Sequence, residues 1–395
     1  MSWPLVKLAD IAVHLRNGAS IKQTEGTGGL PITRIETIAN REVNLDKCGY
    51  AGVGEAEYLN YRLDNGDILI SHINSEKHLG KCAIFESDRN DIIHGMNLLC
   101  LKVNDKAYPK YVYYYLSSYV FLSKLPRITK KSVNQASFTV THFKELEIPL
   151  PPLDEQKRIA AILDKADDIR RKRQQAINLA DDFLRSVFLD MFGDPVTNPK
   201  GFPLGTIRDF VETANYGSSG KASETEGEYP MLRMGNITYQ GGWDFKNLKY
   251  IDLSEKDKPK YLTQKGDLLF NRTNSKELVG KTAVFEEEKP MAIAGYLIRI
   301  RTNKLGNNYY LSGYLNSTHG KKTLVGMCKS IVGMANINAQ EVQNIKIVLP
   351  PIELQNEFEN IVKTTKQKLK SFDKSSELLN DNFNSLSQKA FAGEL

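Results

Sequence analysis

The sequence predicts a mixed α+β fold, in which two similar domains follow each other in tandem and each is followed by a long helix. Three observations support this prediction. The chain of 395 residues repeats its own landmarks at a nearly constant offset. Short strand-like runs alternate with turn residues, and two long stretches carry apolar side chains at helical spacing.

An internal repeat organises the whole chain. Gly66–Leu69 reads Gly-Asp-Ile-Leu and returns 200 positions later as Gly-Asp-Leu-Leu at Gly266–Leu269. The motif Leu-Pro-Pro-Leu at Leu150–Leu153 returns after 199 positions as Leu-Pro-Pro-Ile at Leu349–Ile352. So constant an offset indicates two copies of one large unit rather than a solenoid of short repeats. Two copies of a binding domain suggest a ligand that itself has two parts.

Each copy has a globular part and a helical part, and a Pro-Pro pair separates them. Strand-like runs such as Asp67–Ser71, Leu98–Val103 and Tyr296–Arg301 lie between turn residues. The expected segments are a first globular domain at 1–150, a central spacer helix at 151–200, a second globular domain at 201–349 and a C-terminal spacer helix at 350–395.

The two spacer helices are expected to pair as an antiparallel coiled coil. Asp154 is suited to cap the first helix, and Gly193 followed by Pro195 is suited to end it. The apolar residues of each helix form a stripe that is too narrow to make a core of its own, so each helix needs a partner. Because globular domains and helices alternate along the chain, the favoured partner is the other helix. The alternative, in which each helix lies flat on its own domain, stays open. The residues expected at the helix-pair or partner interface are Ile159, Ile162, Ile169, Phe183 and Val187, and Phe358, Ile361, Leu369, Phe372 and Leu379.

Composition excludes several classes of protein. Hydrophobic residues make up 41% and charged residues 25% of the chain, as in ordinary globular proteins. There is no apolar run of membrane-spanning length and no signal-peptide pattern at the N-terminus, so a cytoplasmic protein is expected. The four cysteines show neither Cys-x-x-Cys nor histidine spacing, so neither disulfides nor a metal site is predicted. The net charge of +6 is compatible with nucleic acid but is modest for a small DNA-binding domain.

Taken in order, these motifs resemble the specificity subunit of type I restriction-modification systems. The likeness is carried by Gly-Asp-[Ile/Leu]-Leu, by Gly-Lys, by Leu-Pro-Pro-x-x-x-Gln and by the terminal Ala-Phe-x-Gly-Glu-Leu at 390–395. The resemblance implies a non-catalytic subunit in which each target-recognition domain reads one half of a split target in double-stranded DNA. It implies that the helix pair sets the distance between the halves.

The same resemblance implies partners. Two modification (methyltransferase) subunits would bind the helices and methylate adenine with S-adenosylmethionine, and restriction subunits would join through them. Cofactors, namely S-adenosylmethionine, ATP and Mg, are expected only in those partner subunits. The chain itself is expected to hold no cofactor and to contact no membrane.

The residues expected to contact DNA are polar or cationic side chains in loops that recur in both copies. Arg and Asn can read guanine and adenine, whereas Lys, Ser and Thr reach phosphates. The loops with the pattern Gly-x-Ser-x-Lys (from Gly18 and from Gly217) are small, which suits close approach to a backbone. The predicted set is Ser20, Lys22, Arg34, Asn74, Lys77, Lys81 and Lys131 in the first copy, and Ser219, Lys221, Arg233, Asn271, Arg272, Asn274, Lys276, Lys281 and Lys329 in the second.

Two other classes of function stay open. A coiled-coil scaffold or adaptor that joins two proteins without DNA contact would tolerate removal of the basic charges. A self-sufficient nuclease or methyltransferase is least favoured, because no histidine pair is duplicated and Glu155-Gln156-Lys157 opens a helix. Gly280-Lys281-Thr282 lacks the earlier glycine that a P-loop needs. The sequence therefore predicts no catalytic residue and no metal ligand.

Overall fold

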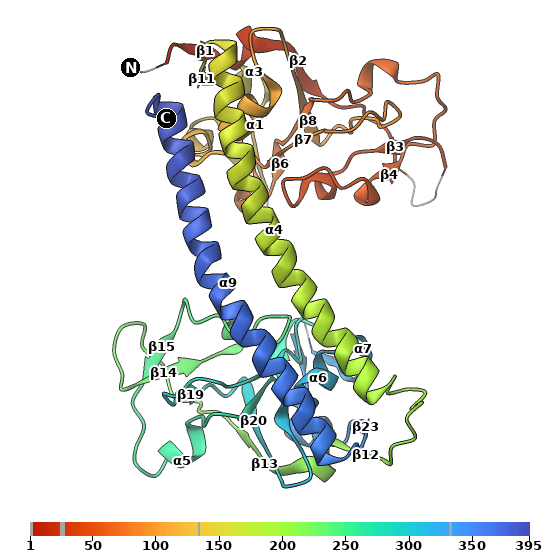
Figure 1. Cartoon of the computed structure of the whole chain (residues 1–395), viewed down its shortest axis with the longest axis vertical. Coiled ribbons are helices and arrows are strands. Elements are labelled where there is room, and N and C mark those ends of the chain that lie inside the picture. The colour runs from red at the N-terminus through yellow and green to blue at the C-terminus, as the bar shows by residue number, and fades with distance from the viewer. Residues whose placement is uncertain (1–2, 24–27, 133–134, 332–333) are drawn as a thin grey trace. The chain divides into compact units, whose positions relative to one another are not determined.

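The computed structural model describes residues 3–23, 28–132, 135–331 and 334–395, without the side chains of 329–331 and 371–377. It forms two compact units, Met1–Arg173 with Lys374–Leu395, and Gln174–Asp373. Each unit holds one globular domain and parts of the two long helices α4 (Leu153–Phe192) and α9 (Ile352–Ala392), drawn in yellow to green and in blue in Figure 1. The predicted α+β fold with two tandem domains is confirmed.

A four-stranded antiparallel sheet in the order β2-β8-β5-β7 is the centre of the first domain. Alternate residues of these strands point to opposite faces, and each face has its own apolar core. One face packs against α1 through Ile68, Ile70, Leu99 and Leu101. The other face packs Leu69, Leu98 and Cys100 against Ile38 and Phe85. The elements are β1 (Leu5–Lys7), β2 (Ala12–Asn17), β3 (Pro31–Ile32), β4 (Gly49–Tyr50), β5 (Ile68–Ser71), β6 (Ile73–Asn74), β7 (Cys82–Ile84), β8 (Leu98–Val103), α1 (Pro109–Ser117), α2 (Tyr119–Leu122), β9 (Lys130–Lys131), β10 (Ala136–Ser137), α3 (Val140–Lys144) and β11 (Glu147–Pro149).

The second domain repeats this plan with the sheet order β13-β20-β16-β18. Its two cores again lie on opposite faces of the sheet, one of them against α6. The elements are β12 (Leu204–Thr206), β13 (Val211–Tyr216), β14 (Tyr229–Leu232), β15 (Lys249–Ile251), α5 (Lys258–Tyr261), β16 (Leu268–Asn271), β17 (Thr273–Asn274), β18 (Thr282–Val284), β19 (Ala292–Ile293), β20 (Leu297–Thr302), α6 (Asn308–Asn316), α7 (Thr318–Met327), β21 (Lys329–Ile331), β22 (Met334–Asn336), α8 (Ala339–Gln343) and β23 (Lys346–Val348).

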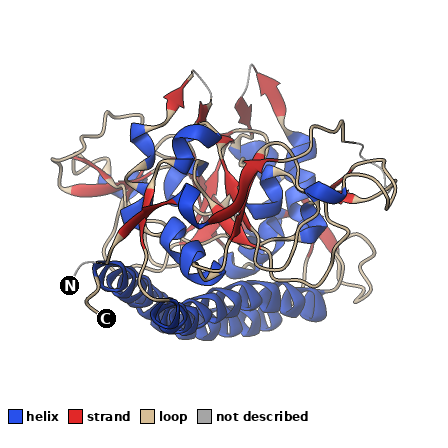
Figure 2. Cartoon of the chain, turned by 90° about the horizontal axis from the view of Figure 1, so that it is seen from above, coloured by secondary structure: helices blue, strands red, loops and turns tan. Residues whose placement is uncertain are grey.

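A second, small sheet stands beside each central sheet. In the first domain its strand order is β6-β10-β9, and in the second domain it is β17-β22-β21. The hairpin of each small sheet stands on the side of its own domain that faces away from the long helices (Figure 2). Each domain thus presents a short hairpin, β9-β10 or β21-β22, on the face that its helices leave free.

The glutamine of each Leu-Pro-Pro-x-x-x-Gln motif fixes the start of a long helix. Gln156 is buried; its Nε2 donates to the carbonyls of Lys106 (3.0 Å) and Pro151 (2.8 Å), and its Oε1 accepts from the Tyr108 amide (2.8 Å). Gln355 repeats this arrangement in the second unit, with the carbonyls of Leu305 (3.1 Å) and Pro350 (2.9 Å) and the amide of Asn307 (2.9 Å). A buried amide that lost these bonds would cost about 1–3 kcal/mol for each unsatisfied group. The motif recurs because each domain needs the same attachment to its helix.

Within the first unit the two long helices run antiparallel. Arg158 donates to the carbonyl of Leu395 (2.9 Å), and the guanidinium of Arg170 lies over the ring of Phe383 (4.4 Å). A later residue of α4 thus meets an earlier residue of α9. The beginning of α4 also joins the core of its own domain through Ile159 and Leu163. The two predicted arrangements, pairing with the other helix and packing on the domain, therefore occur together.

The second unit contains the other ends of the same helices. The rings of Phe188 and Phe192 near the end of α4 pack edge-to-face on Phe358 of α9, at 5.4 and 5.6 Å between centroids. Gly193 ends α4 as predicted, with a φ of 77° that favours glycine and an amide that donates to the Leu189 carbonyl (2.8 Å). The predicted cap at Asp154 is wrong. The helix begins one residue earlier, so Asp154 lies inside its first turn.

None of the helices in the described part of the chain is both long enough and apolar enough to cross a membrane.

Candidate nucleic-acid interface

The small sheet of the first domain brings together two polar segments that lie far apart in the sequence. Asn74 of β6 pairs in register with Ala136 of β10, which pairs in turn with Lys131 of β9. The Lys131 ammonium lies 2.6 Å from the Glu76 carboxylate, and both side chains are mostly exposed. Lys77 is exposed on the same loop. The fold therefore brings Asn74 and Lys131 onto one small sheet, with Lys77 in the loop that follows strand β6.

The same sheet in the second domain carries Asn274 opposite Ala335, with Lys329 opposite Asn336. Lys276 is exposed in the loop that follows Asn274. The side chain of Lys329 lies outside the described residues. The backbone register nevertheless places the two basic segments of this domain on one small sheet, as in the first domain.

Arg272 lies at the base of this hairpin and is held by the protein. Its Nη2 donates to Asn336 Oδ1 (3.1 Å) and its Nη1 to the Gly295 carbonyl (3.4 Å), while its guanidinium lies over the Tyr216 ring (4.8 Å). Asn271, the preceding residue, is fully buried, and neither atom of its amide has a hydrogen-bond partner among the described residues. A DNA contact stays a prediction for both residues, and the structure places Arg272 much nearer the surface than Asn271.

The first domain has different chemistry at this place. Its chain carries Ser71 and His72 where the second copy has Asn271 and Arg272. His72 is buried with its ring edge against Phe138, and burial lowers the pKa of its imidazole to about 4. The imidazole is therefore neutral near neutral pH, whereas the guanidinium is always charged. The two hairpins are alike in backbone and unlike in charge.

The recurring lysines Lys81 and Lys281 bind their own chain. The Lys81 ammonium donates to the Ala39 carbonyl (2.8 Å) and the Lys281 ammonium to the Met234 carbonyl (2.8 Å). Burial lowers the pKa of both ammonium groups, and Lys281 is almost fully buried. Each lysine thus supports a neighbouring loop, which explains its recurrence without DNA. Their predicted contact with phosphates remains untested.

The recurring arginines Arg34 and Arg233 lie in the loops that these lysines support. Arg34 donates through Nε to the Gln23 amide oxygen, and Arg233 donates through Nη2 to the Asn247 carbonyl (2.9 Å). Both side chains are half-buried. These bonds orient the guanidinium groups, and a contact with bases stays a prediction.

The two Gly-x-Ser-x-Lys loops expose their polar side chains. A Cβ on Gly18 would lie 2.3 Å from the Gly95 carbonyl carbon, and a Cβ on Gly217 would lie 2.3 Å from the Ala294 oxygen. The close approach that these glycines permit is therefore to the chain itself. The exposed residues of the two loops are Ser20, Lys22, Ser219 and Lys221.

The residues predicted for the helix interface differ widely in burial. Ile159 and Phe358 are buried, whereas Ile169 and Phe183 are 52% and 51% exposed. The side chain of Phe372 lies outside the described residues. That any of the predicted interface residues contacts a partner protein stays a prediction. The half-buried members are Ile162, Val187, Ile361, Leu369 and Leu379.

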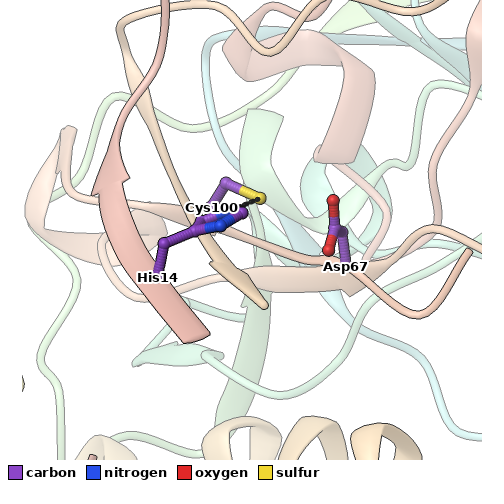
Figure 3. A group of neighbouring side chains, drawn as sticks. All are labelled: His14, Asp67 and Cys100. Atoms are coloured by element: carbon purple, nitrogen blue, oxygen red, sulfur yellow. Dashed lines mark hydrogen bonds between the residues drawn. The ribbon is translucent and has the colours of Figure 1, made fainter. Parts of the chain in front are cut away.

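The fold brings together one cluster of side chains that no sequence motif reveals. His14, Asp67 and Cys100 come from three separate segments, and their potential ligand atoms all lie within 4.8 Å of one another (Figure 3). The signal that could have found them is a difference between the copies. The second copy has Arg299 where the first has Cys100, as the strand register shows.

Comparison with known proteins gives a consistent result. A family model described as "Type I restriction modification DNA specificity domain" matches the chain twice, at residues 2–179 and 199–386. The putative type I restriction enzyme MjaX specificity subunit of Methanocaldococcus jannaschii is 33% identical over 365 residues, which cover 89% of this chain and 84% of that protein.

Two solved structures are similar in fold. The type I restriction-modification S subunit from M. genitalium superposes with a TM-score of 0.58 at 16% identity, over 99% of this chain and 96% of that one. A chain from a structure of complex assembly and conformational transition of the type I restriction-modification system gives a TM-score of 0.50 at 16% identity. That match covers 100% of this chain and 98% of the other.

Proposed function

We propose that this chain, which belongs to the DNA specificity subunits of type I restriction-modification systems, reads a bipartite target in double-stranded DNA. Members of this family are non-catalytic components of their enzymes. In this proposal residues 1–150 and 201–349 are target-recognition domains, one for each half-site, and residues 151–200 and 350–395 are spacers. The subunit works in the cytoplasm, and S-adenosylmethionine, ATP and Mg belong to its partners.

The observation that carries the proposal is the pair of small sheets. Both domains present a hairpin on the side away from their helices, and the third strand of each small sheet carries an asparagine, Asn74 or Asn274, followed in sequence by an exposed lysine, Lys77 or Lys276. The chemistry at the base of the hairpin differs, with neutral His72 in one domain and charged Arg272 in the other. Equal backbones with unequal side chains suit two readers of different sequences.

The long helices are proposed to set the distance between the half-sites. Each helix has one end in each unit, and 40 residues of α-helix are about 60 Å long. Half-sites about one helical turn apart would present both major grooves on one face of the duplex. Exposed apolar side chains on these helices, such as Ile169 and Phe183, suit the docking of two modification subunits. Restriction subunits would join through these.

Removing the exposed charge of Lys276 tests DNA contact by the loop that follows β17. We expect Lys276→Ala, in complex with the modification subunits, to weaken DNA binding and to reduce the slope of log K against log salt concentration by about one. The measurement is a salt titration of DNA binding by fluorescence anisotropy.

The matched control is Lys265→Ala. This lysine is also exposed and belongs to the same domain, but it pairs with Glu288 outside the small sheet. The salt slope of this variant should stay that of the unaltered protein. If Lys276→Ala and Lys265→Ala have the same slope, the loop after β17 makes no phosphate contact through Lys276 and the scaffold function gains support.

A further inference from the structure

The two domains share a buried carboxylate at one place in the fold. Asp67 precedes β5 and Asp267 precedes β16, and they are 1% and 3% exposed. In both, Oδ2 accepts a hydrogen bond from the amide three residues earlier, that of Asp64 (2.9 Å) or Gln264 (2.8 Å). The turn before the strand is therefore the same, and each carboxylate keeps a second oxygen, Oδ1, for another partner.

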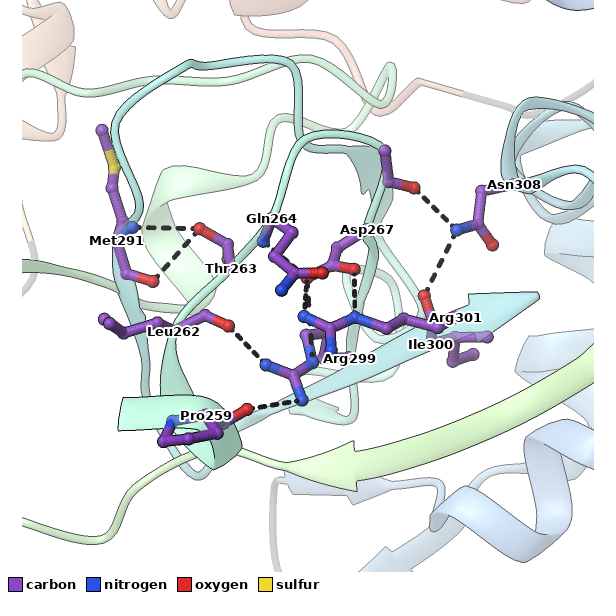
Figure 4. Close-up of polar contacts among 11 residues, drawn as sticks. Pro259, Leu262, Thr263, Gln264, Asp267, Met291, Arg299, Ile300, Arg301 and Asn308 are labelled. Carbon is purple, nitrogen blue, oxygen red and sulfur yellow. Dashed lines mark hydrogen bonds and ion pairs between the residues drawn. The ribbon is translucent and has the colours of Figure 1, made fainter. Parts of the chain in front are cut away.

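In the second domain this partner is a guanidinium. Arg301 donates through Nε to Oδ1 of Asp267 (2.7 Å) and through Nη2 to Oδ2 (3.0 Å) (Figure 4). Arg299, itself buried, brings its Nε to 3.8 Å from Oδ2 and donates to the Pro259 carbonyl (3.4 Å) and to that of Leu262. A carboxylate taken out of water needs such a positive charge.

The first domain lacks both guanidinium groups. In the strand register, Cys100 takes the place of Arg299 and Lys102 the place of Arg301. Lys102 turns instead to the carboxylate of Asp64. Oδ1 of Asp67 is buried and accepts no well-formed hydrogen bond from the described residues; its near neighbour is the Cys100 thiol, a weak donor that lowers the pKa of the Asp67 carboxyl against the larger rise caused by burial. In the second domain guanidinium groups lie beside the buried carboxylate, whereas in the first domain no guanidinium group of the described residues occupies the matching position.

Two metal-binding side chains point into this position. Cys100 lies on the central strand β8 and His14 on the neighbouring strand β2, and Sγ and Nε2 are 3.8 Å apart (Figure 3). Together with the Asp67 carboxylate they place all three ligand atoms within 4.8 Å of one another. Around a tetrahedral zinc ion, ligand atoms are roughly 3.3–3.8 Å apart, given bond lengths of about 2.0–2.3 Å. The histidine and the cysteine are already at this separation, and a small rotation brings in the carboxylate.

The neighbouring cations are occupied elsewhere. Arg16, on the same strand as His14, donates to the Asn60 carbonyl and lies over the ring of Tyr61 (4.9 Å). Lys102 is paired with Asp64, as described above. Neither one donates a hydrogen bond to Oδ1 of Asp67, although the charge of Lys102 lies near enough to lower the pKa of that carboxyl, again against the rise caused by burial.

We propose that His14, Asp67 and Cys100 bind a divalent transition-metal ion, Zn²⁺ in particular, which takes the place of the guanidinium groups in the second domain. One thiolate, one imidazole and one carboxylate form a donor set that zinc prefers over Mg²⁺ or Ca²⁺. Binding releases the thiol proton to solvent. His14 is half-exposed, which leaves an entry path and room for water as the fourth ligand.

The role of the ion would be structural. It would join β2 and β8 to the turn before β5, whereas in the second domain Asp267, Arg299 and Arg301 join only β20 to the turn before β16. The sequence predicted no metal ligand, because the three residues have no motif spacing. The site is recognised only from the fold and from the differences between the two domains.

Cobalt binding to the full chain tests the proposal. The protein is freed of metal with a chelator and titrated with Co²⁺, and its visible and near-ultraviolet absorption is recorded. We expect one Co²⁺ per chain, with a thiolate-to-cobalt charge-transfer band and with d–d bands of tetrahedral intensity, both removed by Zn²⁺.

The variants identify the ligands. Cys100→Ser should lose the charge-transfer band, and His14→Gln, a change on a half-exposed strand position, should lower Co²⁺ affinity at least tenfold while the fold is kept. Cys328→Ser, which alters a half-buried cysteine of the second domain, should leave the spectrum as it is. Absence of bound Co²⁺, or a spectrum that survives both Cys100→Ser and His14→Gln, would overturn the proposal.

Discussion

Replacing Asp267 with alanine is expected to destabilise the second domain by about 3–5 kcal/mol. The change leaves the buried guanidinium of Arg299 and the half-buried guanidinium of Arg301 without their carboxylate. Breaking a buried ion pair from one side costs this much because the remaining charge keeps its desolvation penalty. Hydrogen exchange followed by mass spectrometry, on peptides that cover β13, β20 and β16, measures the free energy of opening.

The internal repeat supplies the control. Asp67→Ala, in protein freed of divalent metal, removes the same side chain and the same bond to a backbone amide, but it leaves no guanidinium behind. Its cost should be that of the lost hydrogen bond, about 1–2 kcal/mol. Equal losses for the two variants would contradict the view that Asp267 neutralises the buried arginines.

Replacing Phe391 with alanine is expected to destabilise the first unit by about 3–5 kcal/mol. Its ring packs edge-on against Tyr111 (5.6 Å) and Tyr115 (5.0 Å) of α1, and it is almost fully buried. The variant leaves a cavity where the end of α9 meets the first domain. Hydrogen exchange in α1 and in the last turns of α9 should therefore accelerate together.

Leu378→Ala is the matched control for this prediction. Leu378 lies in the part of α9 that belongs to the same unit, and it is 63% exposed. Its loss should change stability by no more than about 0.5 kcal/mol. If Phe391→Ala leaves the exchange of α1 unchanged, the end of α9 does not hold that domain.

The architecture could be predicted because its signals are repeated and local. A constant offset shows two copies whatever their contacts, and the run from α4's first turn to Gly193 shows a long helix by its period and its cap. Which residues of the long helices are buried was harder to predict. Phe188 and Phe192 contact Phe358 although the predicted stripe did not include them, whereas Phe183 is half exposed. Each helix packs on a globular domain as well as on its partner helix, so a single apolar stripe does not describe its buried residues.

The candidate site depended on contacts that no local pattern reveals. Asn74 and Lys131 come onto one small sheet only because β6 and β9 flank the same strand, β10. Lys281 was predicted to clamp phosphate from its recurrence, yet the fold gives it a carbonyl to bind at Met234. A residue that recurs in both copies can serve the folding of each domain as well as the binding of a ligand. Differences between copies, such as Cys100 for Arg299, point more directly to separate roles.

The methylated motif tests the central claim, that one chain reads two half-sites at a distance set by its helices. Methylated adenines are mapped in cells that carry the chain with its matching modification subunits, first unaltered and then with one helical turn inserted into α4 after Arg173 and into α9 after Asp373. A turn of four residues adds about 6 Å, roughly two base pairs of DNA. We predict two short specific segments separated by unspecified base pairs, and a gap that changes in the insertion variant while both segments stay the same. A contiguous motif, or a gap that the insertion leaves unchanged, would contradict this account.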